Sequence, residues 1–293
     1  MSTSNPAVVT CALTGALTNP EVFPVPVTPE EMADAAEQAW NAGATCLHTH
    51  YRNQEPGLGF LPSWDPDVVA EIDAAIQDRV PDMLICMSTG VMGDDISGPL
   101  SCMERIRPEI AALNAGSLNY LKVRRDGSWA WPPLLFDNNV DKIERFLAEM
   151  KRLDVIPECE CFDTGIVRSI GMFAQREMLP KPIHVSFVMG VASGMPAKPS
   201  WVPLLVDELP EGAEWQTIAI GRQEVWDLHR TTAELGGHVR SGLEDTFYLP
   251  DGSKAANNGQ LIDALVKTVR ETGREIASIE ETRRIMGVTR AEA

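Results

Sequence analysis

Two histidines separated by one residue, His48 and His50, are the sharpest chemical signal in this sequence. They end an apolar run, residues 45–50, that has the composition of a buried strand. Side chains at positions i and i+2 of a strand project from the same face, so both imidazoles should point to one side. Two imidazoles on one face form half of a metal site, although a pair of hydrogen-bonded core histidines is the alternative.

A carboxylate that could complete this site follows another strand-like run, residues 239–243. Glu244 and Asp245 come directly after that run, and Arg240 lies within it. Two histidines and one carboxylate leave coordination positions open, as in catalytic rather than structural zinc sites. We therefore predict that the two histidines and Glu244 bind a divalent metal, zinc first, with manganese, iron or cobalt as alternatives. The other interpretation of Glu244 and Asp245 is a solvated loop pair.

Glu158 and Glu160 share one face of a third strand-like run, residues 155–161. Carboxylates inside a sheet are costly unless they are paired, hydrogen-bonded or close to a metal. We therefore expect one of the two glutamates to be functional. The alternative is an ion pair with a lysine or arginine of the interior.

Glycine-rich turns follow several strand-like runs, and they suggest where a cofactor could approach the backbone. Gly190 and Gly194 bracket one turn, and Arg222 adds a cation to another. We predict that these three residues and Asn114 contact the cofactor, because loops late in a barrel often bind phosphate. The alternative is that each glycine only ends its strand.

Eight apolar strand-like runs alternate with amphipathic helical stretches along the chain. The predicted strands are residues 7–13, 45–50, 83–88, 117–123, 155–161, 183–189, 215–220 and 239–243. The predicted helices are residues 29–41, 68–79, 101–106, 139–153, 165–177, 223–235 and 258–272. Trp129 and Trp131, followed by two prolines, are expected to form a lid or an interface segment.

Repeated strand–helix units predict either a closed barrel or an open doubly wound sheet. The polar residues gather at the carboxyl ends of many strands, and a barrel brings all these ends to one mouth. No GxGxxG follows the first strand, which disfavours a dinucleotide-binding sheet. We therefore predict an α/β protein with one (β/α)8 TIM-barrel domain spanning residues 1–293.

The charge and the cysteines restrict the partners and the compartment. A net charge of −17 repels phosphate backbones and anionic membranes, so we expect neither a nucleic acid nor a membrane as partner. The N-terminus lacks the features of a signal peptide, which favours a cytoplasmic location. The six cysteines contain no CxxC pair and are expected to be reduced and buried.

Seven ordered motifs resemble those of the β-keto acid cleavage enzymes, a family typified by enzymes that cleave 3-keto-5-aminohexanoate. The motifs are VTCALTGA (9–16), HTH (48–50), MSTG (87–90), PEIAALNAGS (108–117), PECE (157–160), FVMGV (187–191) and GGHVRSGLED (236–245). Together they cover nearly the whole chain.

The resemblance implies a zinc-dependent barrel that forms a homo-oligomer, a dimer or a tetramer. It also implies a reaction in which a β-keto acid and acetyl-CoA give acetoacetate and a new acyl-CoA, with the metal stabilising an enolate. Position by position, it implies the metal ligands His48, His50 and Glu244, the general base Asp245, its partner Arg240, and further active-site residues Ser88 and Glu160.

Two departures from the family pattern bear on the substrate. Leu17 stands where the typical enzyme has an acidic residue, and Ala112 stands where it has a threonine. Without the acidic side chain an amino substrate is disfavoured, and 3-oxoadipate, a simple 3-oxoalkanoate and dehydrocarnitine become candidates.

Two other functions remain open. The first is a metal-dependent aldolase or hydrolase that does not use CoA, and acetyl-CoA dependence would separate it from the family reaction. The second is a non-catalytic barrel that keeps zinc as a ligand sensor. Open coordination positions beside an Arg–Asp pair disfavour the second.

Overall fold

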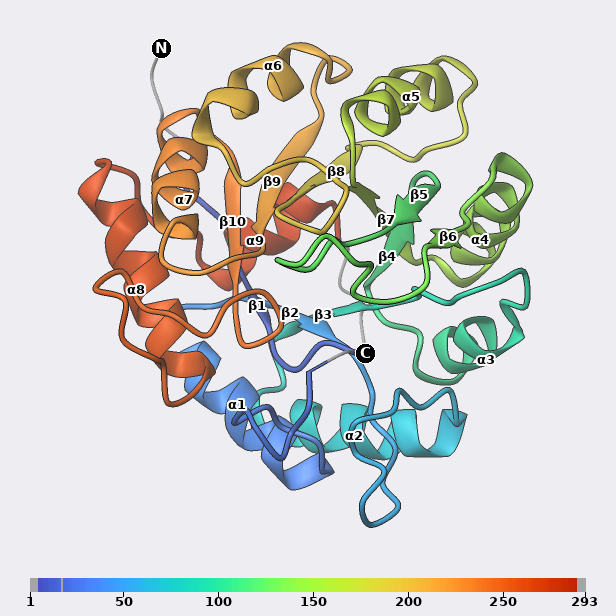
Figure 1. Ribbon diagram of the computed structural model, residues 1–293, viewed down its shortest axis with the longest axis vertical. Coiled ribbons are helices and arrows are strands. Elements are labelled where there is room, and N and C mark those ends of the chain that lie inside the picture. Colours follow the sequence, from blue (N-terminus) through green and yellow to red (C-terminus); the bar gives the residue numbers. More distant parts are fainter. Residues whose placement is uncertain (1–4, 17, 289–293) are drawn as a thin grey trace.

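Eight parallel strands form a closed barrel surrounded by helices (Figure 1). This computed structural model describes residues 5–16 and 18–288. The barrel strands are β1 (Val9–Ala12), β2 (Cys46–Thr49), β3 (Leu84–Met87), β4 (Ile110–Asn114), β7 (Ile156–Cys161), β8 (His184–Met189), β9 (Glu214–Ala219) and β10 (His238–Ser241). β1 pairs with both β2 and β10, which closes the sheet and confirms the predicted TIM barrel.

Helices between the strands cover the outside of the barrel (Figure 1). They are α1 (Pro29–Asn41), α2 (Pro66–Arg79), α3 (Ser97–Ile106), α4 (Val140–Leu153), α5 (Thr164–Gln175), η1 (Pro199–Trp201), α6 (Val202–Asp207), α7 (Val225–Glu234), α8 (Asn258–Glu271) and α9 (Ile279–Met286). The start of α1 is a capping box between Thr28 and Glu31. The short helices α6 and α9 were not predicted.

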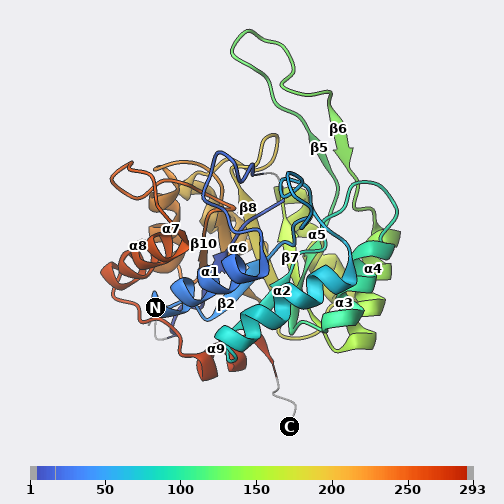
Figure 2. The same ribbon diagram turned by 90° about the horizontal axis from the view of Figure 1, so that it is seen from below.

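The predicted fourth strand is wrong. The barrel strand at that point is β4, and residues 117–123 contain β5 (Leu118–Tyr120), which pairs antiparallel with β6 (Leu134–Phe136). This hairpin rises from the mouth of the barrel (Figure 2). The β4 sequence IAALN is buried throughout but contains two alanines, so its strand signal is weak. In β5, by contrast, Leu118 is buried, Asn119 is exposed and Tyr120 is half-buried.

The end of the barrel opposite the hairpin is closed by apolar side chains from α9. Ile285 and Met286 pack against a buried layer that includes Cys46, Cys86 and Ala112. A packed lower end leaves the carboxyl ends of the strands as the open end, which is where barrel enzymes place their chemistry.

All six cysteines are free thiols and buried, as predicted. Across residues 5–16 and 18–288, every helix is too short or too polar to cross a lipid bilayer.

Candidate metal and acid–base site

The three predicted metal ligands come together at the mouth of the barrel. His48 lies on β2, His50 follows it, and Glu244 follows β10; β1 lies between these two strands. The Glu244 Oε1 atom is 3.7 Å from Nε2 of His48 and 3.4 Å from Nε2 of His50. One ligand atom from each residue lies within 4.8 Å of the others. The structure therefore brings these three side chains together.

The donor set fits a divalent transition metal. Two imidazole nitrogens and a carboxylate oxygen are ligands that zinc accepts, and three protein ligands leave room for a substrate. Oε2 of Glu244 is buried and has no hydrogen-bond partner among the described residues. Burial and Arg240 lower the pKa of His48 well below its usual value, so the ring is neutral, as a metal ligand must be.

Two glycines make room for Glu244. Gly15 has a φ of +61°, and a Cβ at that position would lie 2.8 Å from Cγ of Glu244. Gly242 also has a positive φ, and a Cβ there would overlap the backbone of Ala12. The turn after β10 therefore depends on residues without a side chain to bring the carboxylate against β1.

Arg240 contacts three carboxyl groups, one of which belongs to the predicted metal ligand Glu244. Its Nε and Nη2 atoms donate to the two oxygens of Asp245, each at 3.0 Å. Nη2 also donates to Oε1 of Glu244 at 2.9 Å, and Nη1 lies 3.5 Å from Oε1 of Glu160. A two-point contact from a planar guanidinium fixes the orientation of Asp245. The predicted Arg240–Asp245 pair is present.

The three carboxyl groups differ in their pKa. Burial raises the pKa of Asp245 to about 6, although Arg240 opposes the shift. Burial raises the pKa of Glu160 to about 8, again against Arg240. Burial also acts to raise the pKa of Glu244, but His48, Arg240 and His50 together hold it well below its usual value. At neutral pH, Asp245 is therefore ionised while Glu160 keeps its proton.

Ser88 and Asn114 lie at the same mouth, at the ends of β3 and β4. Both side chains are buried, and the Ser88 backbone amide donates to Thr49 at 3.0 Å. A Cβ on Gly90 would lie 3.5 Å from Nδ2 of Asn114 and 4.0 Å from Oγ of Ser88. The two polar groups therefore flank one turn, where a ligand can approach the backbone.

The other predicted cofactor-binding residues lie further around the barrel. A Cβ on Gly190 would overlap the carbonyl of Ile220, and one on Gly194 would lie 2.9 Å from the carbonyl oxygen of Phe162. Close backbone packing therefore explains both glycines by itself. Arg222 is exposed, and its guanidinium lies 5.1 Å from the centre of the Tyr248 ring.

Arg52 is a residue that sequence reasoning missed. Its guanidinium is buried and donates to the carbonyl oxygens of Thr14 at 2.7 Å and Thr18 at 2.9 Å. It therefore holds the loop that follows β1 beside the metal ligands. The period of two that selected the two histidines continues to position 52, and that signal could have found it. Leu17, which carried the substrate argument, lies outside the described residues.

Comparison with known proteins identifies relatives of this chain. The sequence profile of the family described as beta-keto acid cleavage enzyme matches residues 6–288. A 3-oxoadipate:acetyl-CoA acetyltransferase of Cupriavidus necator is 30% identical over 99% of this chain and 97% of its own. A 3-keto-5-aminohexanoate cleavage enzyme of Fusobacterium nucleatum is 31% identical over 96% and 97%.

A solved structure also shares the fold. The ternary complex of ObcA with C4-CoA adduct and oxalate superposes with a TM-score of 0.71 at 19% identity, covering 90% of this chain and 67% of the other. The profile match over nearly the whole chain, together with the relatives near 30% identity, establishes the family. The chain belongs to the β-keto acid cleavage enzyme family.

Proposed function

We propose that this protein is a zinc-dependent enzyme that converts a β-keto acid and acetyl-CoA into acetoacetate and a new acyl-CoA. The observation that carries the proposal concerns Arg240. Its guanidinium donates to Glu244, which lies beside His48 and His50, and also to the ionised Asp245. The names of the relatives, several of which include acetyl-CoA, support the same reaction class.

The reaction needs no outside oxidant or reductant. The bond between the keto carbon and the α-carbon of the β-keto acid breaks, and the acyl group that is released forms a thioester with CoA. The acetyl group of acetyl-CoA forms a new carbon–carbon bond with the remaining two-carbon acid. A proton must leave the α-carbon before that bond can form, so the site needs a base.

Asp245 is the base in this proposal. Arg240 donates to both of its oxygens and keeps it ionised near neutral pH, so the carboxylate is aligned and able to accept a proton. When bound, a divalent metal would supply Lewis acidity that stabilises negative charge on the substrate oxygens. Glu160 retains its proton at neutral pH and can donate it, while the Ser88 hydroxyl can hydrogen-bond a carbonyl oxygen.

Arg222, Gly190, Gly194 and Asn114 are proposed to contact acetyl-CoA. The exposed Arg222 guanidinium offers a charge to a phosphate group, and Asn114 offers an amide at the mouth. Replacing Arg222 by alanine should raise the KM for acetyl-CoA and leave kcat unchanged. An unaltered KM would remove Arg222 from this role.

The acyl side chain is proposed to lack an amino group, because Leu17 replaces an acidic residue. A direct test compares 3-oxoadipate, a 3-oxoalkanoate, dehydrocarnitine and 3-keto-5-aminohexanoate, each with acetyl-CoA, by measuring acetoacetate and the new thioester. We expect one of the first three to be preferred. Preference for the amino substrate would refute the inference from Leu17.

The same assay separates the competing functions. Cleavage of the β-keto acid without acetyl-CoA would identify a CoA-independent aldolase or hydrolase. Zinc binding with no turnover of any substrate would favour a ligand sensor.

We further propose a homo-oligomer, a dimer or a tetramer, in the cytoplasm. The hairpin exposes the apolar side chains of Val123, Trp129, Leu134 and Leu135, which fit a protein contact. Six free thiols fit a reducing compartment. Light scattering on the purified protein would give its mass, and a monomer at all concentrations would contradict the assembly.

A further inference from the structure

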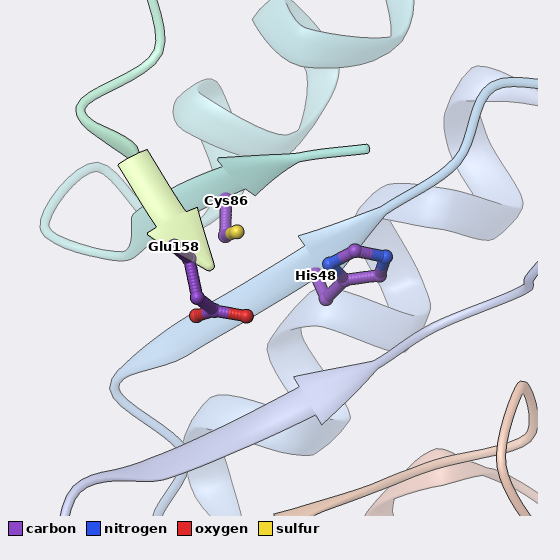
Figure 3. Close-up of side chains that lie close together, drawn as sticks. All are labelled: His48, Cys86 and Glu158. Atoms are coloured by element: carbon purple, nitrogen blue, oxygen red, sulfur yellow. The ribbon is translucent and has the colours of Figure 1, made fainter. Parts of the chain in front are cut away.

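A second group of potential ligands lies directly beneath the metal site. One ligand atom from each of His48, Cys86 and Glu158 lies within 4.8 Å of the others (Figure 3). The three residues come from β2, β3 and β7, and each is at most 3% exposed. His48 belongs to both groups, so the lower group acts on the metal site through this residue.

The two ring nitrogens of His48 face different neighbours. Nε2 lies 3.7 Å from Glu244 at the mouth. Figure 3 shows the other ring nitrogen, Nδ1, on the side of Cys86 and Glu158. Among the described residues, neither Nδ1 of His48 nor Oε1 of Glu158 has a hydrogen-bond partner, although both atoms are buried. Leaving a buried polar group without a hydrogen bond is unfavourable, so two such groups beside each other require an explanation.

We propose that Glu158 is a positioning residue for the metal ligand His48, whose Nδ1–H donates to the Glu158 carboxyl group through one water molecule. This inference rests on the proposed metal site. A proton held on Nδ1 leaves the lone pair on Nε2, the nitrogen that faces Glu244 and the metal. Histidine ligands are oriented in this way by carboxylates in many metal sites.

The surroundings of Glu158 hold its carboxyl group in place. Gln216 donates to the Ser186 hydroxyl at 3.0 Å, and both side chains lie beside Glu158. On β4, the neighbour of Glu158 in the strand register is Ala112, which belongs to the same buried layer as Cys86. The acceptor is therefore held by β8 and β9 and faces β2 across the barrel.

A second metal ion in the lower group is the alternative, and two features disfavour it. His48 would have to bind an ion through each nitrogen, which requires loss of both ring protons. Glu158 already interacts with the side chains of Ser186, Gln216 and Cys86. A single ion on Nε2 of His48 and a hydrogen bond from its Nδ1–H satisfy both ring nitrogens, and the ring does not have to become an imidazolate.

The test measures zinc affinity and stoichiometry by chelator competition on the full chain, without acetyl-CoA or turnover. We expect one zinc per chain in the wild type. Glu158→Leu removes the acceptor and should weaken zinc binding by about 10–100-fold. Glu158→Gln keeps a carbonyl acceptor and should restore the affinity to within roughly threefold of the wild type. Cys86→Ala removes the third member of the lower group but keeps the acceptor, so it should weaken zinc binding much less than Glu158→Leu does.

A second readout follows the proton itself. The chain has five histidines, so the ring nitrogens can be resolved by NMR after 15N labelling of histidine. In the zinc-loaded wild type, His48 should carry its proton on Nδ1, and in Glu158→Leu that proton should exchange faster. Thermal unfolding of the metal-free proteins checks that all three variants are folded.

Three results would overturn the inference. They are wild-type zinc affinity in Glu158→Leu, failure of Glu158→Gln to restore binding, and a second zinc that disappears in Cys86→Ala. If the wild type binds no zinc, both this inference and the metal site fail. If zinc binding follows the expected pattern but no acetoacetate forms, only the proposed reaction fails.

Discussion

At the scale of single residues, Arg240 determines the electrostatics of the site. It is 2% exposed and contacts Asp245, Glu244 and Glu160. A guanidinium stays protonated throughout the physiological pH range, so this contact does not switch off. Burial raises the pKa of Glu160 and Asp245 against the effect of this cation, whereas His48, Arg240 and His50 together lower the pKa of Glu244.

Replacing Asp245 by asparagine tests its role as base. Asparagine preserves the size of the side chain and can still accept a hydrogen bond from Arg240, but it cannot take a proton. We expect kcat to fall by about 10²–10⁴-fold, with zinc content unchanged by metal analysis. Near-normal turnover would exclude Asp245 as the base.

The pH dependence of kcat/KM should show two limbs. Asp245 must be ionised, so the rate should fall about tenfold per pH unit below its pKa of about 6. Glu160 must be protonated if it donates a proton, so the rate should also fall above about pH 8. Glu160→Gln should abolish the alkaline limb and keep the acid limb. An alkaline limb that persists in this variant would belong to another group.

At the scale of elements, the strands bring the ligands together and the helices set the stability of the barrel. β2 and β10 each pair with β1, so residues nearly 200 positions apart in sequence share one rim. α9 closes the opposite end with Ile285 and Met286. A packed floor lowers the local dielectric, which strengthens the charge interactions above it.

Asp73 on α2 provides a test of stability that is separate from catalysis. Burial, with a smaller contribution from Glu109, raises the pKa of Asp73 to about 7. An unfolded aspartate ionises near pH 4, so above that pH the unfolded chain releases its proton first. Stability should therefore fall as the pH rises from about 4 to about 7.

The corresponding variant is Asp73→Asn. It should raise the free energy of unfolding by roughly 1–3 kcal/mol at pH 8 and by little at pH 4, as measured by urea denaturation. Asp78→Asn, an exposed position on the same helix, is the control and should change little at either pH. An equal gain at both pH values in Asp73→Asn would show that ionisation is not the cause.

At the scale of the whole molecule, the proposed metal site combines residues from early and late parts of the chain. His48 and His50 come early and Glu244 comes late, so an ion bound by all three joins segments that separate on unfolding. A ligand that binds only the folded state stabilises it by mass action.

Zinc should therefore raise the melting temperature, and chelation by EDTA should lower it. At a free zinc concentration 100 times Kd, the gain is about 2.7 kcal/mol. His50→Ala should remove most of the zinc-induced shift while leaving the metal-free protein folded. A zinc-induced shift of wild-type size in this variant would place the ion elsewhere.

Much of the site followed from short-range rules that act within one segment. The period of a strand aligned His48 with His50 and Glu158 with Glu160, and this alignment does not depend on the rest of the chain. Helix starts such as Thr28 before α1 are also local, because the cap satisfies amides in its own first turn. Barrel closure was inferred from the alternation of strands and helices and from where polar residues gather.

Other features depended on contacts between distant segments, and only the tertiary structure decided them. β4 is a barrel strand because its neighbours bury it on both sides, although its alanine-rich sequence is a poor strand former. The predicted barrel strand at residues 117–123 instead contributes β5 to the hairpin, because β5 pairs with β6 and not with a barrel strand. The partners of Arg52 and Glu158 were also decided by the tertiary structure, because the sequence pattern does not show that Arg52 donates to the loop after β1 or that Glu158 lies close to His48 and Cys86.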